Sequence, residues 1–306
     1  MISWNAAVLI ALAVLAVLII AEIWRELHSF KVTRYTVESG RLPENGKDRL
    51  RIVFLSDLHN REYGKENERL YQAVLAEHPD LILIGGDMLV GKDGVSYEPA
   101  LRFVRKLPGI CPVYYANGNH EQRMKEEPEE YSGAYSGYRE ALEKAGIHFL
   151  ENESRVITAG NLSLELCALE LPLDTYRKLR KIAVTPDEVA ELTGRPVRKP
   201  VDDSGLPYCI LLAHNPAYMN AYKAWGADLI LSGHLHGGIV RIPGLGGVIS
   251  PQAFLFPKYS GEMTADGGQT VIVSRGLGTH TIQLRLFNTP ELISISLKPC
   301  PHKTER

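Results

Sequence analysis

The chain has 306 residues, a length that suits two domains or one large α/β domain. Charged residues make up 23% and hydrophobic residues 45%, and the net charge of -2 gives no reason to expect nucleic acid as a partner. The four cysteines are far apart in the sequence and form no Cys-x-x-Cys pair: Cys111, Cys167, Cys209 and Cys300. This spacing argues against a zinc ribbon and against a disulfide framework. No obligate protein partner is evident.

The N-terminal run is apolar enough to cross a membrane. Residues 1–21 carry no charged side chain, and Trp4 and Trp24 bracket the apolar stretch. Twenty helical residues span about 30 Å, the thickness of the hydrocarbon layer, and indole rings prefer its two interfaces. We therefore predict an uncleaved transmembrane anchor over residues 1–24. A cleaved signal peptide and a buried core helix are the alternatives, but no Lys or Arg precedes the run.

Basic residues come after this run and not before it. Arg25, Lys31 and Arg34 follow the anchor, and by the positive-inside rule they favour a cytoplasmic position for the rest of the chain. Residues 25–49 are expected to hold a leading strand and a polar linker, and residues 50–300 the main globular domain.

Five short apolar runs, each a predicted strand, end in polar residues. The runs cover residues 51–55, 81–84, 112–116, 208–212 and 229–231. Helices are predicted near 64–78, 98–107, 136–145 and 216–225. The polar residues that follow the strands are Asp57, His59, Asp87, Asn119, His120, His214, His234 and His236.

The spacing of these residues indicates one shared site. Asp57 and Asp87 are 30 residues apart and Asp87 and Asn119 are 32 apart, about one strand-helix-strand unit each. In open α/β sheets, ligands bind beyond the carboxyl ends of the strands, so we expect all eight side chains to converge on one rim. Each has an ordinary alternative, such as a helix cap for Asp57 or a core position for His214. Their repeated placement after five apolar strands favours the shared site.

The residue types indicate two metal ions. Seven ligand-type groups are too many for one tetrahedral site and suit two sites of five or six ligands completed by water or substrate. Imidazole and carboxylate donors without thiolate favour Mn²⁺, with Fe or Zn²⁺ as alternatives. Two cations about 3.5–4 Å apart polarise a phosphoryl group and generate a hydroxide at neutral pH.

Together these motifs resemble the signature of the calcineurin-like metallophosphoesterase superfamily. They are Asp57-x-His59, Gly86-Asp87, Gly118-Asn119-His120-Glu121, His214 and Gly233-His234-x-His236. The resemblance extends from Arg51 to roughly Leu297 and is strongest to the bacterial membrane-anchored phosphodiesterases and UDP-2,3-diacylglucosamine hydrolases. It implies an α/β fold in which two facing mixed sheets are flanked by helices, a four-layer α/β/β/α sandwich, here preceded by one transmembrane helix.

The resemblance also implies a role for each residue. The implied ligands of the first metal ion are Asp57, His59 and His236. The implied ligands of the second are Asn119, His214 and His234, with Asp87 bridging both ions. His120 would protonate the leaving oxygen or steady the transition state. Val90 stands where some relatives carry an acidic residue that supports this histidine, so its supporting partner is not evident.

The expected protein is a membrane-tethered, two-metal hydrolase whose nucleophile is a metal-bound hydroxide. Its expected targets are phosphodiester or pyrophosphate bonds in a lipid- or nucleotide-linked substrate. The alternatives are a phosphomonoesterase or nuclease on the same site, and a non-catalytic scaffold of the same fold.

Three features outside the motifs have open interpretations. Residues 172–207 include a capping box at Thr185-Pro186-Asp187-Glu188, and they form either a cap over the site or a surface packing helix. The cluster 253–256 would contact an acyl chain or the bilayer, or form core of a second sheet, and we favour core. Arg275 and His280 lie in a Gly-rich turn and would contact the substrate or, more commonly, solvent.

Overall fold

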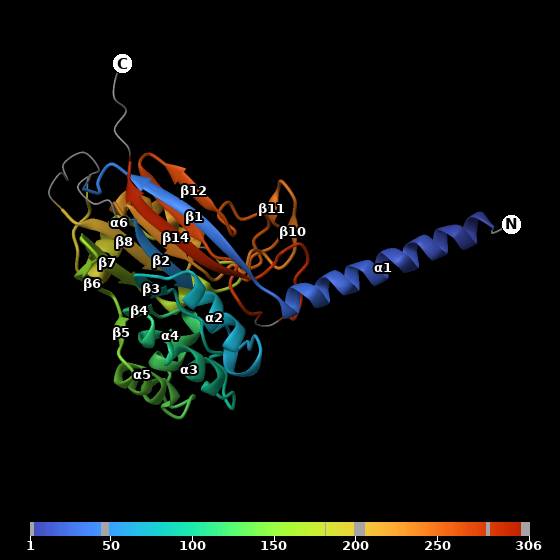
Figure 1. The fold of residues 1–306 in the computed structure, drawn as a ribbon, viewed down its shortest axis with the longest axis horizontal. Helices are drawn as coiled ribbons and strands as arrows, with labels where there is room; N and C mark the ends of the chain where they lie inside the picture. The colour runs from blue at the N-terminus through green and yellow to red at the C-terminus, as the bar shows by residue number, and fades with distance from the viewer. Residues whose placement is uncertain (1–2, 44–48, 181, 199–205, 280–281, 301–306) are drawn as a thin grey trace, which may run out of the picture.

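Two six-stranded sheets face each other in the computed structural model, which describes residues 3–43, 49–180, 182–198, 206–279 and 282–300 (Figure 1). In the first sheet the strand order is β1 (Lys31–Ser39), β14 (Glu291–Pro299), β2 (Leu50–Leu55), β3 (Leu81–Ile84), β4 (Val113–Ala116), β5 (Ile147–Leu150). In the second it is β12 (Met263–Asp266), β13 (Gln269–Val273), β9 (Leu229–Ser232), β8 (Tyr208–Ala213), β7 (Leu162–Leu169), β6 (Glu153–Ala159).

Both sheets are mixed, as predicted. Strands β2 to β5 are parallel, and β14 joins β2 antiparallel. In the second sheet β7, β8, β9 and β13 are parallel, whereas β6 and β12 pair antiparallel at its edges. A short antiparallel pair, β10 (Arg241–Ile242) and β11 (Gly246–Gly247), stands apart from both sheets.

Alternation along the strands builds the layers. In β2, Ile52 and Phe54 point into the core between the two sheets, whereas Val53 and Leu55 point to the opposite face, against helices. Helices covering the first sheet are α2 (Glu68–Ala76), α3 (Glu98–Val104), α4 (Asn119–Glu126) and α5 (Ala134–Lys144). Those covering the second are α6 (Pro186–Thr193) and α7 (Met219–Trp225). The predicted four-layer sandwich is confirmed.

Helix α1 (Trp4–His28) projects from the body (Figure 1). Within the described residues it is the one helix long and apolar enough to cross a membrane, and its most apolar stretch has no buried part. That exposure removes the core-helix alternative. The helix continues to His28, four residues beyond the expected boundary, and β1 then pairs with β14 along its whole length.

The segment 172–207 divides into two parts. Thr185 caps α6 as the capping box predicts: its hydroxyl accepts from the Glu188 amide at 3.2 Å, and the Glu188 carboxylate accepts from the Thr185 amide at 2.7 Å. Helix α6 packs on α7 and buries Val189. Of the two alternatives for this segment, α6 therefore follows the surface packing helix and not the cap over the site. The 3₁₀ turn η3 (Leu173–Tyr176) instead approaches the predicted rim.

The core interpretation of residues 253–256 is wrong. Leu255 and Phe256 are 66% and 55% exposed. An isolated bridge between Ile249 and Leu255 holds this segment in a surface loop. The space between the sheets is filled instead by strand residues such as Leu231 and Ile272.

We expect Phe54→Ala to lower the free energy of unfolding by about 3–5 kcal/mol, because the ring is fully buried between the sheets and its loss leaves a cavity. Urea unfolding of the full-length protein in detergent measures this. Leu75→Ala on α2 is the control, since Leu75 is 40% exposed and its truncation should cost less than about 1 kcal/mol. Equal midpoints for the two variants would contradict the packing described.

Candidate metal centre

All eight predicted residues lie at one end of the paired sheets. Three loops of the first sheet carry five of them, after β2, β3 and β4, and two loops of the second sheet carry three, after β8 and β9. Seven are less than 9% exposed and His236 is partly buried. The seven implied ligands and His120 therefore come from both sheets to a single buried cluster.

The donor atoms form two groups that meet at Asp87. In the first, His59 Nε2 lies 3.1 Å from His236 Nε2, which is 3.5 Å from Asp57 Oδ1. In the second, His214 Nε2 lies 3.1 Å from Asp87 Oδ2, and His234 completes the group. Asp87 Oδ2 is also 3.7 Å from His59 Nε2, so this carboxylate faces both groups.

The backbone turns sharply to bring these side chains together. Five of the predicted ligands have positive φ, between 46° and 65°: Asp57, His59, Asp87, His234 and His236. Such strained positions concentrate at functional sites. Two motif glycines allow the close approach, since a Cβ on Gly118 would lie 2.2 Å from Asp87 Oδ1 and one on Gly233 2.3 Å from Asp57 Oδ2. The glycines beside the ligands thus make room for carboxylates.

Hydrogen bonds to the backbone orient the ligands. His214 Nδ1 lies 2.6 Å from the Gly85 carbonyl and His236 Nδ1 lies 3.1 Å from the Gly278 carbonyl. A carbonyl accepts a hydrogen bond, so each Nδ1 carries a proton, and it is Nε2 that faces the cluster and offers a lone pair when the imidazole is neutral. Asp57 Oδ1 accepts from the His234 amide at 2.9 Å.

His120 is oriented in the opposite sense. The Gly91 amide donates to His120 Nδ1 at 2.9 Å, so Nδ1 is the acceptor and neutral His120 carries its proton on Nε2. The support that an acidic side chain would give from position 90 is supplied here by the next backbone amide. A Cβ on Gly91 would lie 2.5 Å from the His120 carbonyl oxygen, so glycine allows this contact.

Glu121 joins the loop after β3 to α4. Its carboxylate accepts from the amides of Asp87 and Met88, each at 2.8 Å, from the Gly118 amide at 3.1 Å and from the Tyr115 hydroxyl at 2.7 Å. Burial, and then the charge of Asp87, raise the pKa of Glu121 to about 7, against the hydrogen bonds that favour its ionised form. Glutamate in this position therefore fixes two ligand-bearing loops relative to each other.

The charges of the cluster are mutually stabilised. Burial opposes charge on Asp87 and on His214, yet their attraction holds the pKa of Asp87 well below its usual range and raises the pKa of His214 to about 10. Burial, and then His214, lower the pKa of His234, and burial lowers the pKa of His236. Without a cation, His214 therefore holds a proton toward Asp87. A metal ion would take the place of that proton, because metal ions bind ionised carboxylates and neutral imidazoles.

Buried donor atoms without hydrogen-bond partners show that the cluster fits cations. Within the described residues, Asp57 Oδ2, Asn119 Oδ1 and His234 Nε2 are buried and accept no hydrogen bond. Leaving such a group unsatisfied costs about 1–3 kcal/mol. Oxygen and imidazole nitrogen atoms of this kind can offer lone pairs, which is the chemistry that a divalent cation requires and an apolar ligand does not.

A cavity of about 330 Å³ opens beside the cluster. One wall carries His59, Asp87, Asn119, His120, His234 and His236. Arg123 and Lys178 add positive charge, and the Tyr176 ring lies 4.9 Å from the His234 ring, centroid to centroid. The opposite wall is apolar: Ile239, Ile249, Pro251, Ala253, Ile282 and Leu284.

Sequence reasoning missed the cationic residues of this cavity, although one had a signal. Arg123 is four residues after Asn119 and so shares its helix face, which a helix prediction over 119–126 would have indicated. Lys178 follows η3, and nothing local in the sequence marks it. Arg275 turns away, donating to the Gly261 carbonyl at 3.0 Å, and does not line this cavity. His280 lies outside the described residues.

Comparison of the sequence with family models identifies the family to which the chain belongs. The model of calcineurin-like phosphoesterases matches residues 50–238, more than half of the chain. The chain belongs to the calcineurin-like phosphoesterase family. Its match covers all seven implied ligands and His120.

Similar proteins extend the comparison beyond that range. The phosphodiesterase YaeI of Escherichia coli is 28% identical over 250 residues, covering 81% of this chain and 82% of YaeI. The uncharacterized metallophosphoesterase YkuE of Bacillus subtilis is 26% identical over 283 residues, 89% of this chain and 87% of YkuE. Among solved structures, the sulfate thiohydrolase SoxB of Thermus thermophilus aligns with 84% of this chain and 57% of its own, at 15% identity and a TM-score of 0.46. The protein is a metal-dependent hydrolase of phosphoesters.

Asp87→Asn should reduce bound divalent metal from about two ions to less than one per chain, because an amide cannot supply an anionic bridge to both ligand groups. Elemental analysis of the purified full-length protein measures this. Asp93→Asn removes an exposed carboxylate from the loop after the same strand and should leave metal content unchanged. Full metal occupancy in the Asp87 variant would contradict its shared position.

Proposed function

We propose that this hydrolase is a membrane-tethered enzyme that cleaves phosphodiester or pyrophosphate bonds in a lipid- or nucleotide-linked substrate. The observation that carries the proposal is the pair of ligand groups around Asp87, with His120 beside them and an open cavity in front. A phosphoryl group bound in the cavity would lie between the cluster and two of the cationic side chains that line it, Arg123 and Lys178.

Seven residues would hold the metal ions. Asp57, His59 and His236 form one set, Asn119, His214 and His234 the other, and Asp87 is shared. The mixed imidazole, carboxylate and amide donors favour Mn²⁺, with Fe or Zn²⁺ as alternatives. When bound, two such cations would supply Lewis acidity toward the phosphoryl oxygens and a bridging hydroxide as the nucleophile.

His120 would deliver a proton to the leaving oxygen. Its Nε2 carries the proton because Nδ1 accepts from the Gly91 amide. An alcohol leaving a phosphodiester needs such a proton, since an alkoxide is a poor leaving group in water, and a positioned imidazole contributes about 10²–10⁴-fold. A phosphomonoester with an alcohol leaving group has the same need, so the substrate panel separates the two.

Two cationic side chains support a substrate with a second charged group. Arg123 and Lys178 line the cavity on elements far apart in the chain, at α4 and after η3. Guanidinium and ammonium groups bind phosphate oxygens by charge-assisted hydrogen bonds. A pyrophosphate, or a diester joined to a further phosphate, would occupy both. UDP-2,3-diacylglucosamine, which joins a lipid to a nucleotide by a pyrophosphate, therefore belongs among the substrates to be tested.

The anchor is proposed to remain attached after synthesis. Glu26, in the last turn of α1, is buried and accepts hydrogen bonds from the Asn288 amide at 2.9 Å and the Thr289 hydroxyl at 3.0 Å. The end of the helix is thus built into the body, which supports an anchor over a cleaved signal. Arg25, Lys31 and Arg34 favour a cytoplasmic position for the body.

Cys300 offers a test of that position, because it is an exposed free thiol on the body. A membrane-impermeant maleimide should leave Cys300 unmodified in intact cells and modify it after permeabilisation. Cys300→Ser provides the background from the other cysteines. Equal modification before and after permeabilisation would place the body outside the cytoplasm.

His120→Ala should lower turnover by about 10²–10⁴-fold while bound metal stays unchanged, because this residue supplies a proton and not a ligand. Rates are measured with bis(p-nitrophenyl) phosphate, p-nitrophenyl phosphate, nucleotide pyrophosphates, UDP-2,3-diacylglucosamine and DNA, with added Mn²⁺. His148→Ala, which removes an exposed histidine on β5, is the control.

The panel separates the proposal from its alternatives. Preference for the monoester or for DNA would contradict the proposed substrate class. Undiminished hydrolysis after chelation and dialysis would contradict the two-metal centre. If the metal-loaded protein hydrolyses no substrate of the panel, the non-catalytic scaffold is the alternative that the result supports.

A further inference from the structure

An exposed apolar surface lies on the loops that follow the metal-ligand histidines of the second sheet. Half of the exposed large apolar side chains outside α1, among the described residues, fall within residues 242–287. We name these six the apolar rim: Ile242, Leu245, Leu255, Phe256, Ile282 and Phe287, each 40–69% exposed. Clusters of exposed apolar side chains mark surfaces that meet a membrane or another molecule.

The loops that carry the rim are bonded to one another. Ile242, Leu245 and Phe287 line one shallow hollow. The Arg241 amide donates to the Leu286 carbonyl at 3.0 Å, and the Phe256 amide donates to the Val248 carbonyl at 2.9 Å. The rim is therefore one surface built from residues 239–257 and 282–289.

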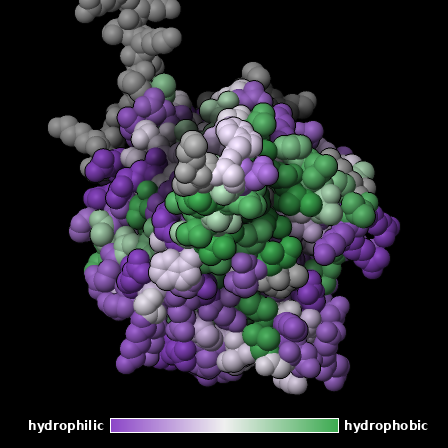
Figure 2. Space-filling view, turned by 90° about the vertical axis from the view of Figure 1, so that its right-hand side faces the viewer, coloured by the Kyte–Doolittle hydropathy of each residue, from purple (hydrophilic) through white to green (hydrophobic). Residues whose placement is uncertain are grey.

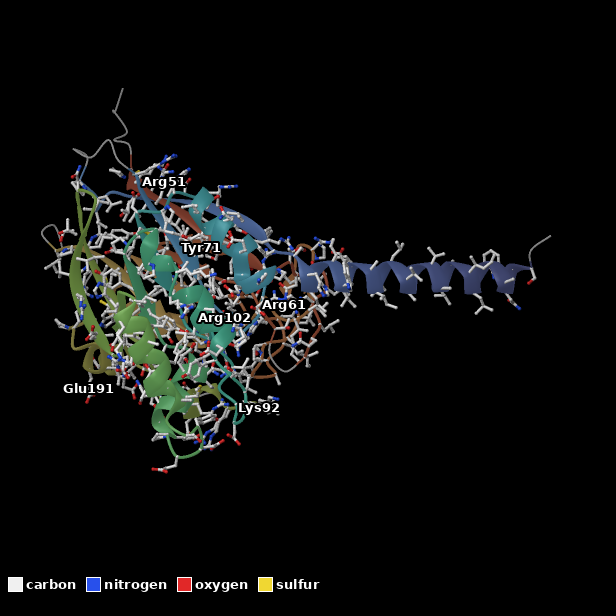
Figure 3. All side chains as sticks on the ribbon, turned by 60° about the horizontal axis from the view of Figure 1, so that its bottom comes forward. Arg51, Arg61, Tyr71, Lys92, Arg102 and Glu191 are labelled. Carbon is white, nitrogen blue, oxygen red and sulfur yellow. The ribbon has the colours of Figure 1, made fainter. Side chains whose placement is uncertain are left out.

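This surface adjoins the root of α1. Glu26 accepts from the Asn288 amide, and the Asn288 side chain donates to the His236 carbonyl at 2.6 Å. Two hydrogen-bonded contacts thus connect the anchor to a loop that holds a metal-ligand histidine. Arg61 makes a second attachment by donating to the Leu27 carbonyl, and Figure 3 shows it beside the root of the helix.

The attachment leaves little distance between the body and the membrane. Trp24 is 64% exposed, and an indole at the end of an apolar span lies at the membrane interface. Glu26 follows two residues later, about 3 Å along the helix axis. Figure 2 views the molecule from the side on which α1 projects, so the helix with its own hydrophobic side chains stands in front of the body in that view. With α1 in a bilayer, a surface beside its root would lie close to the lipid headgroups.

The rim continues into the cavity. Ile282 is 54% exposed and also lines the cavity, and Ile249, paired with Leu255 of the rim, lines it too. The same cavity is lined by metal-ligand residues and by the cationic side chains of Arg123 and Lys178. A ligand that fits both walls has a hydrocarbon part and a phosphate part.

We propose that the apolar rim rests on the bilayer that α1 crosses, and that the tail of a lipid-linked phosphoester enters the cavity along Ile282 and Ile249. The inference rests on the proposed function only in taking α1 as a retained anchor and the site as a phosphoesterase. The partner is the lipid bilayer, because Asn288, next to Phe287 of the rim, is hydrogen-bonded to the base of the apolar helix α1.

The contact with lipid is tested without activity. In full-length Cys300→Ser protein reconstituted in phosphatidylcholine–phosphatidylglycerol vesicles, Phe256→Cys is labelled with an environment-sensitive dye. Emission should shift to the blue relative to detergent, and lipids spin-labelled near the headgroup should quench it. Val156→Cys on β6, where Val156 is 60% exposed, should show neither effect, and unsubstituted Cys300→Ser protein gives the background.

Activity then tests the entry of lipid-linked substrate. Leu255→Ser with Phe256→Ser should lower hydrolysis of UDP-2,3-diacylglucosamine in vesicles by about tenfold, because two side chains no longer contact lipid. Hydrolysis of bis(p-nitrophenyl) phosphate in solution should be unchanged, as should both rates in Val156→Ser. Equal loss on both substrates would mean that the loop supports the site itself and would overturn the inference.

Three further results of these experiments would decide whether the rim contacts lipid. A dye at position 256 that behaves alike in vesicles and detergent overturns the inference, and cross-linking between copies at this position in detergent would assign the rim to a second copy of the chain. If the parental protein hydrolyses none of the substrates, the proposed function fails while the quenching result still decides whether the rim contacts lipid.

Discussion

The site depends on one carboxylate that must be shared between two sheets. Asp87 comes from the first sheet; its Oδ1 accepts from the His120 amide at 2.9 Å, and its Oδ2 faces His214 from the second. Burying such charges is costly unless they are paired. The apolar core between the sheets, with Phe54 at its centre, stabilises the face-to-face arrangement that keeps both sets of strand ends together. Metal binding, proton donation and the cavity all follow from that alignment.

The strand ends could be predicted because two local signals coincide there. A short β-branched run such as residues 51–55 indicates a buried strand, and the carboxyl end of a parallel strand is where an α/β fold binds ligands. The positions of β13 and β14 could not be predicted in the same way. Strand β14 lies between β1 and β2, and the pairing of residues 31–39 with 291–299 leaves no local mark. Helix α4 was missed because its residues are mostly polar and its first turn is held by Glu121.

Other features depend on surroundings that sequence does not encode locally. The support of His120 is a backbone amide at Gly91, and any residue except proline carries one. The run 253–256 has the same composition whether it is buried or exposed, and only its place in a surface loop held by the bridge to Ile249 decides. Glu26 looks like an ordinary charge at the end of an apolar span, yet it is 1% exposed against Asn288. Each is a long-range relation between segments far apart in the chain.

The joint between α1 and β1 has a mechanical consequence. Only Ser29 and Phe30 separate the helix from a strand that pairs with β14 over nine residues. With α1 in a bilayer, so short a joint would hold the body at one height and tilt above the membrane, and the enzyme would meet its substrates in a plane instead of a volume. The site would reach scissile bonds that lie at one distance from the membrane surface, and it would not cleave bonds that lie nearer or farther. The short connection between α1 and β1 would thus select substrates by the distance of their scissile bond from the membrane.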